Sequence, residues 1–427
     1  MAYSNHMKQT YLFILGRQPE LSLAELFGYA EGRKIDIEVL EVIDSAAVIS
    51  GDLPEPLLLM EDLAGAVKIA RAELPLSKPV TIDEWVERLE PMLASSITSK
   101  QSFTFGLSFY GERKYCPSAK YQEKLALSLK RSLKTEIKHL RWVNGHGKPL
   151  SSVQVSKNKL DIPQGCELLI VCVDKKVTIG KTLAVQMFED WSERDYGRPR
   201  RNARQGMLPP KLARMMVNML GLPPQGILLD PFCGSGTVLM EAVLLGWPKL
   251  IGADKSGQAI KDTEMNMKWL MARNPNKTTF AHSHECANDE RIKLLVSAIE
   301  DLPRRLPPSS VSAIVTEPYL GAPLSSPPSE KTIDNIKIEL APLYNKILLA
   351  FDKLLTINGK AIFIVPRWVT VEGQEKFLSV SDLSWPRNPK QCSFRTAASV
   401  SSRRSLIYKR EGQFVNREIV IVEMINR

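Results

Sequence analysis

The sequence predicts an α/β protein in which a small α+β region precedes a mostly parallel sheet. The chain has 427 residues, near three times the common domain size, so two or three domains are expected. From about residue 207 onward, short apolar runs alternate with helical patterns, which is typical of parallel strands joined by crossover helices. The first 76 residues instead follow the order strand, helix, strand, helix, strand, which is typical of a small α+β unit.

The composition indicates a soluble intracellular protein. Hydrophobic residues make up 44% and charged residues 24% of the chain, as in ordinary globular proteins. Apolar runs such as Ala361–Val365 are far too short to span a membrane, and the first residues lack the pattern of a secretory signal. The six cysteines form no Cys-x-x-Cys pair. We therefore expect a cytoplasmic protein with no membrane partner and no metal.

Positive charge is concentrated in the middle of the chain. Residues 1–99 hold 8 Lys/Arg against 16 Asp/Glu, whereas residues 100–160 hold 13 Lys/Arg against 3 Glu. This asymmetry favours a segment that binds a polyanion. On charge alone, an ordinary solvated surface explains it equally well.

The first segment is expected to contain two helices between short strands. The strands are Tyr11–Leu15, one or two within residues 35–49, and Ala66–Ile69. One helix begins at Leu23, with Ser22 as its cap and Glu25 in the capping-box position. A second helix lies near residues 56–63, and the proline-containing residues 74–79 are expected to form a linker.

The second segment contains the strongest helical pattern in the chain. A capped start at Ser118 and an apolar stripe at helical spacing predict a helix that runs to Arg141. Basic residues cover the rest of its surface, namely Lys120, Lys124, Lys130, Arg131, Lys134 and Lys138. A helix is also expected at residues 81–93, and strands at residues 102–109, 152–155, 167–173 and 177–179. The arginine-rich residues 194–206 carry no apolar periodicity and are expected to form a connector.

A glycine-rich turn follows the first strand of the C-terminal region. The strand Ile227–Leu229 leads into Asp230-Pro231-Phe232-Cys233-Gly234-Ser235-Gly236-Thr237, then a helix, then a strand that ends at Asp254. Glycines let the backbone approach a ligand, and the helix N-terminus offers N–H groups to an anion. An acid at the end of the second strand can accept hydrogen bonds from ribose hydroxyls.

The ligand that this turn predicts carries an amine, a carboxylate and a ribose. Asp230 would repel a diphosphate but suits an ammonium group, and Cys233 stands where a dinucleotide fold would need freedom for a pyrophosphate. S-adenosylmethionine has all three groups. A turn that serves only the core is the alternative.

A second candidate element, Thr316-Glu317-Pro318-Tyr319-Leu320-Gly321, ends the fourth strand of this region. In parallel sheets of this kind, ligands bind outside the carboxyl ends of the strands. Glu317 or a backbone carbonyl can accept hydrogen bonds from an exocyclic amine, while Tyr319 stacks on the base. An ordinary turn with a core tyrosine is the alternative.

Together these segments resemble the THUMP-domain tRNA methyltransferases, specifically the guanosine-N2 enzymes of archaea and eukaryotes that act on position 10 of tRNA. The resemblance is closest over residues 180–255. It rests on the order Arg194-Asp195-Tyr196-Gly197-Arg198-Pro199, then Gly206-Met207-Leu208-Pro209-Pro210, then the glycine-rich turn. Residues 179–186 resemble the exit of the family's THUMP domain, and residues 15–26 resemble its ferredoxin-like start.

The resemblance implies a Rossmann-like methyltransferase domain at residues 207–427. Before it stand an N-terminal ferredoxin-like domain at 1–76, a THUMP RNA-binding domain at 77–182 and an arginine-rich linker at 183–206. S-adenosylmethionine is the implied cofactor, and tRNA is the implied partner. Whether the protein has a protein partner is unknown from the sequence.

The resemblance also assigns residues to the site. Glu317, Pro318 and Tyr319 would be catalytic. The cofactor would contact Met207, Leu208, Pro209, Asp230, Pro231, Phe232, Gly234, Gly236, Thr237, Asp254, Ala298, Ile299 and Thr316. From their positive charge, the basic helix named above and the linker arginines are also expected to contact tRNA phosphates, and those arginines are Arg194, Arg198, Arg200, Arg201 and Arg204.

The chain departs from the family at its catalytic motif, Asp-Pro-Pro-Tyr/Phe-Gly. An ungapped match gives Glu317-Pro318-Tyr319-Leu320-Gly321, in which the acid is one methylene longer and the aromatic ring stands one place earlier. Placing Thr316 first keeps the ring in register but loses the acid from first place. Where the family has an acid for the adenine, this chain has Ser297-Ala298-Ile299.

Two other functions remain open on the sequence. One is a DNA or RNA adenine or cytosine amino-methyltransferase, and the other is a tRNA-binding protein that has lost catalysis. The basic second segment favours RNA over DNA, whereas the altered motif keeps the inactive binder open. His282-Ser283-His284-Glu285-Cys286 fits a surface loop better than a metal site, because its potential ligands are crowded into five residues.

Overall fold

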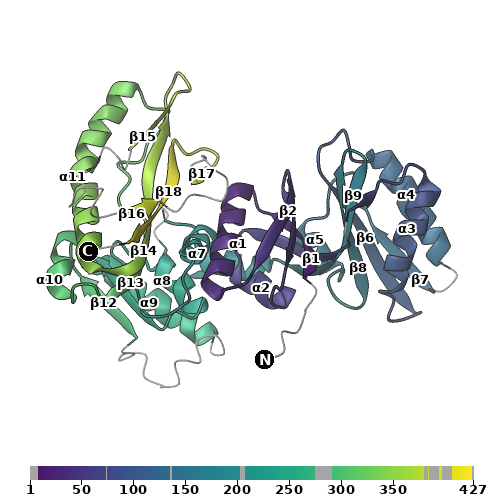
Figure 1. Ribbon diagram of the computed structural model, residues 1–427, viewed down its shortest axis with the longest axis horizontal. Coiled ribbons are helices and arrows are strands. Elements are labelled where there is room, and N and C mark those ends of the chain that lie inside the picture. Colours follow the sequence, from purple (N-terminus) through teal and green to yellow (C-terminus); the bar gives the residue numbers. More distant parts are fainter. Residues whose placement is uncertain are drawn as a thin grey trace. The chain divides into compact units, whose positions relative to one another are not determined.

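Two sheets organise the chain. The computed structural model describes residues 8–73, 75–134, 137–201, 207–274, 291–378, 383, 394–396 and 406–425. The chain divides into two compact units, the first formed by residues 1–23 and 34–190 and the second by residues 24–33 and 191–427. Each unit contains one nine-stranded sheet (Figure 1). The fold class predicted from the sequence is confirmed.

The first unit combines one mixed sheet with short helices. Its elements are β1 (Gln9–Leu15), α1 (Pro19–Arg33, shared between the units), β2 (Ile37–Ile43), β3 (Ala46–Gly51), α2 (Pro56–Asp62), β4 (Ala66–Ala72), β5 (Leu76–Ser77), α3 (Ile82–Ala94), β6 (Ser102–Tyr110), α4 (Ala119–Leu133), β7 (His139–Val143), α5 (Ser152–Lys157), β8 (Gly165–Val173), β9 (Lys176–Val185) and α6 (Phe188–Ser192, also shared between the units). The strand order is β2-β3-β1-β4-β9-β8-β6-β7, with β5 paired to β9. Strands from the predicted regions 1–76 and 77–182 therefore share one sheet through the antiparallel β4–β9 pair.

Three local predictions in this unit were wrong. The first helix begins at Pro19, because proline is favoured at a first helical position; Ser22 lies inside the helix and its Oγ donates to the carbonyl of Gln18. Residues 152–155 form part of helix α5, because Ser151 and Gln154 form a capping box. The helix expected to reach Arg141 ends at Leu133.

The early end of α4 has a packing reason. Strand β7 pairs in parallel with β6, so that Leu140 lies beside Phe103 in the sheet. Leu133 on the helix and Leu140 on the strand bury their side chains in the same hydrophobic cluster. The apolar pattern therefore continues across the boundary although the backbone changes from helix to strand.

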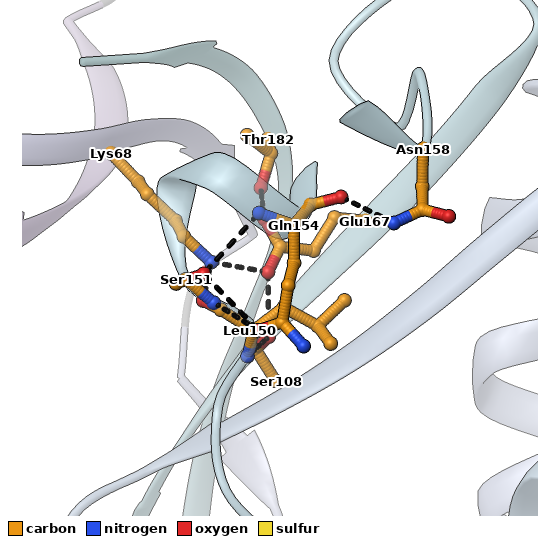
Figure 2. Close-up of polar contacts among 8 residues, drawn as sticks. All are labelled: Lys68, Ser108, Leu150, Ser151, Gln154, Asn158, Glu167 and Thr182. Atoms are coloured by element: carbon orange, nitrogen blue, oxygen red, sulfur yellow. Dashed lines mark hydrogen bonds and ion pairs between the residues drawn. The ribbon is translucent and has the colours of Figure 1, made fainter. Parts of the chain in front are cut away.

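A buried polar network joins four strands of this unit (Figure 2). Lys68 on β4 forms an ion pair with Glu167 on β8 and donates to the carbonyl of Leu150 at 2.7 Å. The Glu167 carboxylate also accepts hydrogen bonds from Ser108 on β6 and Thr182 on β9, at 2.5 and 2.8 Å. Burial lowers the pKa of Lys68, an effect that the Glu167 carboxylate opposes. These contacts satisfy charges that would otherwise be costly to bury.

The second unit is a doubly wound α/β sheet. Its elements are a π-helical turn (Glu193–Gly197), α7 (Pro210–Met219), β10 (Ile227–Asp230), α8 (Thr237–Leu244), β11 (Lys249–Asp254), α9 (Gly257–Arg273), β12 (Ile292–Val296), a 3₁₀ turn (Ile299–Asp301), α10 (Leu302–Arg305), β13 (Val311–Thr316), α11 (Glu330–Leu354), β14 (Leu355–Val369), β15 (Glu375–Phe377), β16 (Phe394–Thr396), β17 (Leu406–Tyr408) and β18 (Val415–Met424). The second half of α1 belongs to this unit, where Asn218 donates to Glu25 at 2.9 Å.

The strand order of the second sheet is β12-β11-β10-β13-β14-β18-β16, with β15 and β17 at its margins. The five strands from β12 to β14 run parallel, whereas β18 runs antiparallel to β14. From β10 the chain builds outward to β11 and β12, and then returns to place β13 on the other side of β10. This reversal makes the carboxyl ends of β10 and β13 the place where ligands bind in such sheets.

Candidate cofactor and catalytic site

The glycine-rich turn leaves β10 at Asp230 and enters α8 at Thr237. Gly234 and Gly236 have φ angles of 52° and 84°, a left-handed conformation that favours glycine. No atom of the described residues lies within 4 Å of the place where a Gly234 side chain would start. The turn therefore presents bare backbone to an approaching ligand.

Two side chains of helix α9 hold the turn in place by hydrogen bonds. Thr263 Oγ1 donates to the carbonyl of Gly234, and Asn266 Nδ2 donates to the carbonyl of Ser235, both at 2.8 Å. A side chain at Gly236 would approach the Thr263 Cγ2 atom to 2.8 Å. These two polar residues fix the turn through its carbonyl groups, and the sequence analysis did not identify them.

Asp254 closes the other side of the turn. Its two carboxylate oxygens accept hydrogen bonds from the backbone N–H groups of Gly234 at 3.1 Å and Ser256 at 2.8 Å. Each carboxylate oxygen has a further lone pair. Asp254 therefore lies at the turn, as predicted, with acceptor capacity left for a ribose hydroxyl.

A hydrogen bond links the turn to the second candidate element. Thr316 at the end of β13 donates through Oγ1 to Asp230 Oδ1 at 2.7 Å, and the N–H of Phe232 donates to the same oxygen at 3.2 Å. Asp230 is 2% exposed. Burial raises the pKa of Asp230 to about 7, against the lowering effect of those two hydrogen bonds. The segments predicted to hold the cofactor and the acceptor amine thus meet at one point.

Glu317 is engaged by an arginine that the sequence analysis did not identify. Arg417 on β18 donates through Nε to Glu317 Oε1 at 2.6 Å. Burial raises the pKa of Glu317, whereas the charge and hydrogen bond of Arg417 lower it. Among the described residues, none donates a hydrogen bond to Oε2, which leaves that oxygen for another donor. The partner was hard to predict because it stands 100 residues further along the chain.

The other residues of the second element differ in exposure. Pro318 is buried, whereas Tyr319 is 49% exposed and so can present its ring to a flat ligand. At the end of β12, Ala298 is half-buried and Ile299 packs in the hydrophobic core. Val296, which pairs with Asp254 in the parallel register, is 52% exposed.

Met207, Leu208 and Pro209 lead directly into α7, and Leu208 is buried. Ahead of them, the linker arginines lie in different environments. Arg194 is mostly buried and forms an ion pair with Glu241 on α8 at 2.9 Å. Arg198 is buried beside Thr237. Neither guanidinium group is on the open surface that phosphate contact requires.

Arg200 and Arg201 are exposed, and the guanidinium of Arg201 lies 4.7 Å from the centre of the Tyr196 ring. Arg204 lies outside the described residues, as do the residues of the histidine- and cysteine-containing segment 282–286. On α4 and the loop after it, Lys120, Lys124, Arg131, Lys134 and Lys138 are exposed and Lys130 is half-buried. The opposite face of α4 buries Leu125, Leu129 and Leu133. A basic face therefore exists where it was predicted.

The residues around the turn fit S-adenosylmethionine. Gly234 offers open backbone, and α8 begins without a side-chain cap on its N-terminal N–H groups. Asp230 and Asp254 supply carboxylates for an ammonium group and for ribose hydroxyls. Among the described residues, no group of three or more potential metal ligands occurs and no helix could span a membrane.

A doubly wound sheet with a glycine-rich turn after β10 and an acid after β11 places the second unit among the α/β domains that bind a ribose-containing cofactor, a class that includes methyltransferase domains. A family model described as "RMKL-like, methyltransferase domain" matches residues 198–373, so this part of the chain is similar to such domains. A second model, described as "DNA methylase", matches residues 99–265. Its range stops before β13 and so does not include the Thr316–Gly321 element. S-adenosylmethionine is the cofactor of the domain.

The curated relatives are named tRNA (guanine(10)-N2)-dimethyltransferase. The protein from Methanothermobacter thermautotrophicus is 30% identical over 169 residues, which cover 39% of this chain and 41% of that protein. The one from Methanocaldococcus jannaschii is 28% identical over 204 residues, or 46% of this chain and 50% of that protein. The chain thus matches about half or less of the length of these relatives. The predicted resemblance to tRNA guanine-N2 methyltransferases is confirmed.

Among solved structures, the crystal structure of TrmN from Thermus thermophilus has a TM-score of 0.53 with this chain. The two are 16% identical, and the match covers 97% of this chain and 100% of that one. At this level of identity the likeness shows the fold. It extends beyond the methyltransferase domain to nearly the whole chain.

Proposed function

We propose that the protein uses S-adenosylmethionine to methylate the N2 amine of a guanosine in tRNA, with position 10 as the expected site. The hydrogen bond between Asp230 and Thr316 carries the proposal, because it brings the cofactor turn and the acceptor element to one point in a methyltransferase domain. The names of the curated relatives support the same nucleotide and position. The cytoplasm is the proposed location.

The reaction requires the acceptor amine to be aligned with the methyl group more than it requires a strong base. S-adenosylmethionine, when bound, supplies a methyl group bonded to a sulfonium sulfur, and the sulfur leaves as a thioether when an amine attacks the methyl carbon in line. The protein has to hold the amine opposite that methyl group. The lone pair of a guanine N2 amine is delocalised into the ring, so hydrogen-bond acceptors that face its N–H bonds favour the reactive pyramidal form.

Three adjacent residues have the chemistry for this task. Glu317 Oε2 and the carbonyl of Pro318 accept hydrogen bonds from the amine, and Tyr319 stacks on the guanine ring. Arg417 keeps the Glu317 side chain in one orientation through its bond to Oε1. The proton leaves to water after methyl transfer, so no histidine is required.

The basic face of α4 is the proposed contact for the tRNA backbone. Its lysines and arginines neutralise phosphates without reading sequence, which positions the RNA and makes binding dependent on salt. The exposed Arg200 and Arg201 are proposed to add to this contact.

A specific observation favours a second candidate, a tRNA-binding protein without methyl transfer. The Glu317 carboxylate is already paired with Arg417, and the side chains are only 13% and 8% exposed. An acid whose charge is neutralised in this way is a weaker acceptor for a substrate amine.

Nucleoside analysis separates the two candidates. Total tRNA would be incubated with the protein and S-adenosylmethionine labelled in its methyl group, and then digested to nucleosides. We expect the label in N2-methylated guanosine. Label in adenosine or cytidine would contradict the proposal, and cofactor and tRNA binding without any label would favour the inactive binder.

A further inference from the structure

Arg198 carries a buried positive charge beside the cofactor turn. It is 3% exposed, and its Nη1 donates to Thr237 Oγ1 at 2.7 Å. Its Nη2 lies 3.7 Å from the sulfur of Met207, and its Nε has no hydrogen-bond partner among the described residues. Within that part of the chain, no carboxylate forms an ion pair with it.

A buried guanidinium ordinarily has an anionic partner, because an unpaired charge is costly to remove from water. Burial lowers the pKa of Arg198 to about 10; Asp195 and Glu241 oppose this shift, while Arg201 adds to it. The side chain therefore remains charged near pH 7. Its environment suits an anionic ligand group that has at least two oxygens for the guanidinium fork.

The neighbouring Arg194 differs in this respect. It comes from the same segment and is also mostly buried, but its Nε forms an ion pair with Glu241. Arg214 on α7 forms an ion pair with the same carboxylate at 2.6 Å. Arg194 therefore has a carboxylate in direct contact, whereas among the described residues no carboxylate forms an ion pair with Arg198.

The segment that carries Arg198 is tied to the glycine-rich turn itself. Asn266 accepts from the N–H of Arg200 and donates to the carbonyls of Arg200 and Ser235. Thr237, which Arg198 contacts, is the first residue of α8, and the N-cap residue Gly236 supplies no side-chain cap. The positive end of that helix and the guanidinium group thus act on the same turn, and both favour an anion there.

We propose that Arg198 binds the carboxylate of the methionine moiety of S-adenosylmethionine. This inference rests on the proposed function for the identity of the ligand. The sequence predicted that Arg198 contacts a tRNA phosphate. The inference assigns this residue to the cofactor instead. The other cofactor groups, the ammonium and the ribose, remain with Asp230 and Asp254.

Paired ligands that differ only in the carboxylate test the inference. Calorimetry would measure the affinity of the full-length protein for S-adenosylmethionine and for decarboxylated S-adenosylmethionine. We expect the wild type to prefer the carboxylate-bearing ligand by about 10- to 100-fold, as for a charged hydrogen bond. Arg198→Met should lose that preference while its affinity for the decarboxylated ligand stays within about twofold, and Arg198→Lys should keep part of it. Arg273→Met, which removes an exposed arginine at the end of α9, is the matched control and should keep the full preference.

Each other outcome is informative. Equal loss of affinity for both ligands in Arg198→Met would mean that Arg198 only supports the fold. Equal affinity of the wild type for both ligands would overturn the inference. This comparison needs no variant, so it remains valid if Arg198→Met does not fold. If Arg198→Met weakens only tRNA binding, the partner is a phosphate and the inference is wrong. A wild type that binds neither ligand would contradict the proposed function as well.

Discussion

The carboxylate of Glu317 is the group on which catalysis depends in this account. Substitution of Glu317 by alanine removes an acceptor that is needed as the amine becomes pyramidal, so the methylation rate should fall by about 100-fold or more. Affinity for tRNA should change little, since the contribution is made in the transition state. Single-turnover rates and binding isotherms measured on the same preparation check this prediction.

Two further variants separate chemistry from folding. Glu317→Ala also leaves Arg417 without its partner, so thermal unfolding has to be measured alongside the rate. Glu317→Gln keeps an oxygen for Arg417 and should retain the fold with a reduced rate. Glu300→Gln alters an exposed acid paired with Lys346 and should leave the rate unchanged. A wild-type rate in Glu317→Ala would remove this residue from the mechanism.

Asp254 should contribute to cofactor affinity through the ribose. Asp254→Ala removes a charged acceptor and is expected to weaken S-adenosylmethionine binding by about 1.5–3 kcal/mol. Because Asp254 also holds the N–H of Gly234, Asp254→Asn serves as the comparison that keeps an oxygen in place. Unchanged affinity of Asp254→Ala in calorimetry would refute the assignment.

Asp230 should make cofactor binding dependent on pH. Its pKa of about 7 in the free protein means that the carboxyl is largely protonated at pH 6 and ionised at pH 8. An ammonium group favours the ionised form, so binding below pH 7 must release a proton. Through Asp230 alone, affinity should therefore rise by about tenfold from pH 6 to pH 8, whereas loss of the ligand's ammonium proton opposes this rise near pH 8 and lowers affinity above it.

Calorimetry in buffers of different ionisation enthalpy measures the proton that is released. The amine of the ligand titrates in this range as well, and comparison with Asp230→Asn removes its contribution. The variant should lack the proton release below pH 7. The same pH dependence in both proteins would show that Asp230 is not the titrating group.

At the scale of residues, the sequence predicted well wherever the signal was local. Asp230, Gly234, Gly236 and Asp254 are close together in the chain, and the structure places them at one turn. Arg417 could not be predicted, because only the antiparallel pairing of β18 with β14 brings it to the end of β13. Arg194 and Arg198 were expected at the surface because a run of charge gives no sign of which members have buried partners.

At the scale of elements, the basic face of α4 should set the salt dependence of tRNA binding. The double variant Lys124→Gln/Arg131→Gln removes two exposed charges from the face that is opposite the buried leucines. Binding should weaken, and the slope of log affinity against log salt should become shallower by about one to two units. Filter binding over a range of salt concentrations gives the slope. The double variant Lys8→Gln/Lys268→Gln removes two exposed lysines elsewhere and should keep the wild-type slope.

The buried network of the first unit should matter far more for stability than an exposed pair. Lys68→Met leaves Glu167 buried without its cation and should lower the free energy of unfolding by about 3–5 kcal/mol. The double variant Lys68→Met/Glu167→Gln should recover most of that loss. Lys8→Met, which breaks an exposed pair with Asp36, should cost at most about 1 kcal/mol. Equal effects of Lys68→Met and Lys8→Met in denaturant titrations would contradict this interpretation.

Element boundaries were the weaker part of the sequence prediction. The types of the helices and strands near the glycine-rich turn were predicted correctly, because short apolar runs and a helical pattern mark them locally. The end of α4 was missed, since Leu133 and Leu140 enter the same core from different elements. The network around Glu167 was missed because its partners come from three other strands that only the folded sheet brings together.

At the scale of the whole molecule, the chain has two compact units, each with its own sheet. The second contains every residue assigned to cofactor binding and chemistry, and the first contains the basic helix assigned to tRNA. The basic segment and the βαβ signature lie in different parts of the sequence. The assignment of tRNA contact to one unit and of cofactor binding to the other could therefore be predicted. The shared sheet of residues 1–76 and 77–182 was not, because pairing of β4 with β9 leaves no local signal.

The most direct test of the account is methyl transfer to two tRNA transcripts that differ at one atom group. One carries guanosine at position 10 and the other carries inosine, which lacks the N2 amine but keeps the remaining base. With labelled S-adenosylmethionine, the account predicts incorporation into the guanosine transcript and none into the inosine transcript, while both bind with similar affinity. Equal incorporation into the two transcripts would contradict the central claim that the N2 amine at this position is the methyl acceptor.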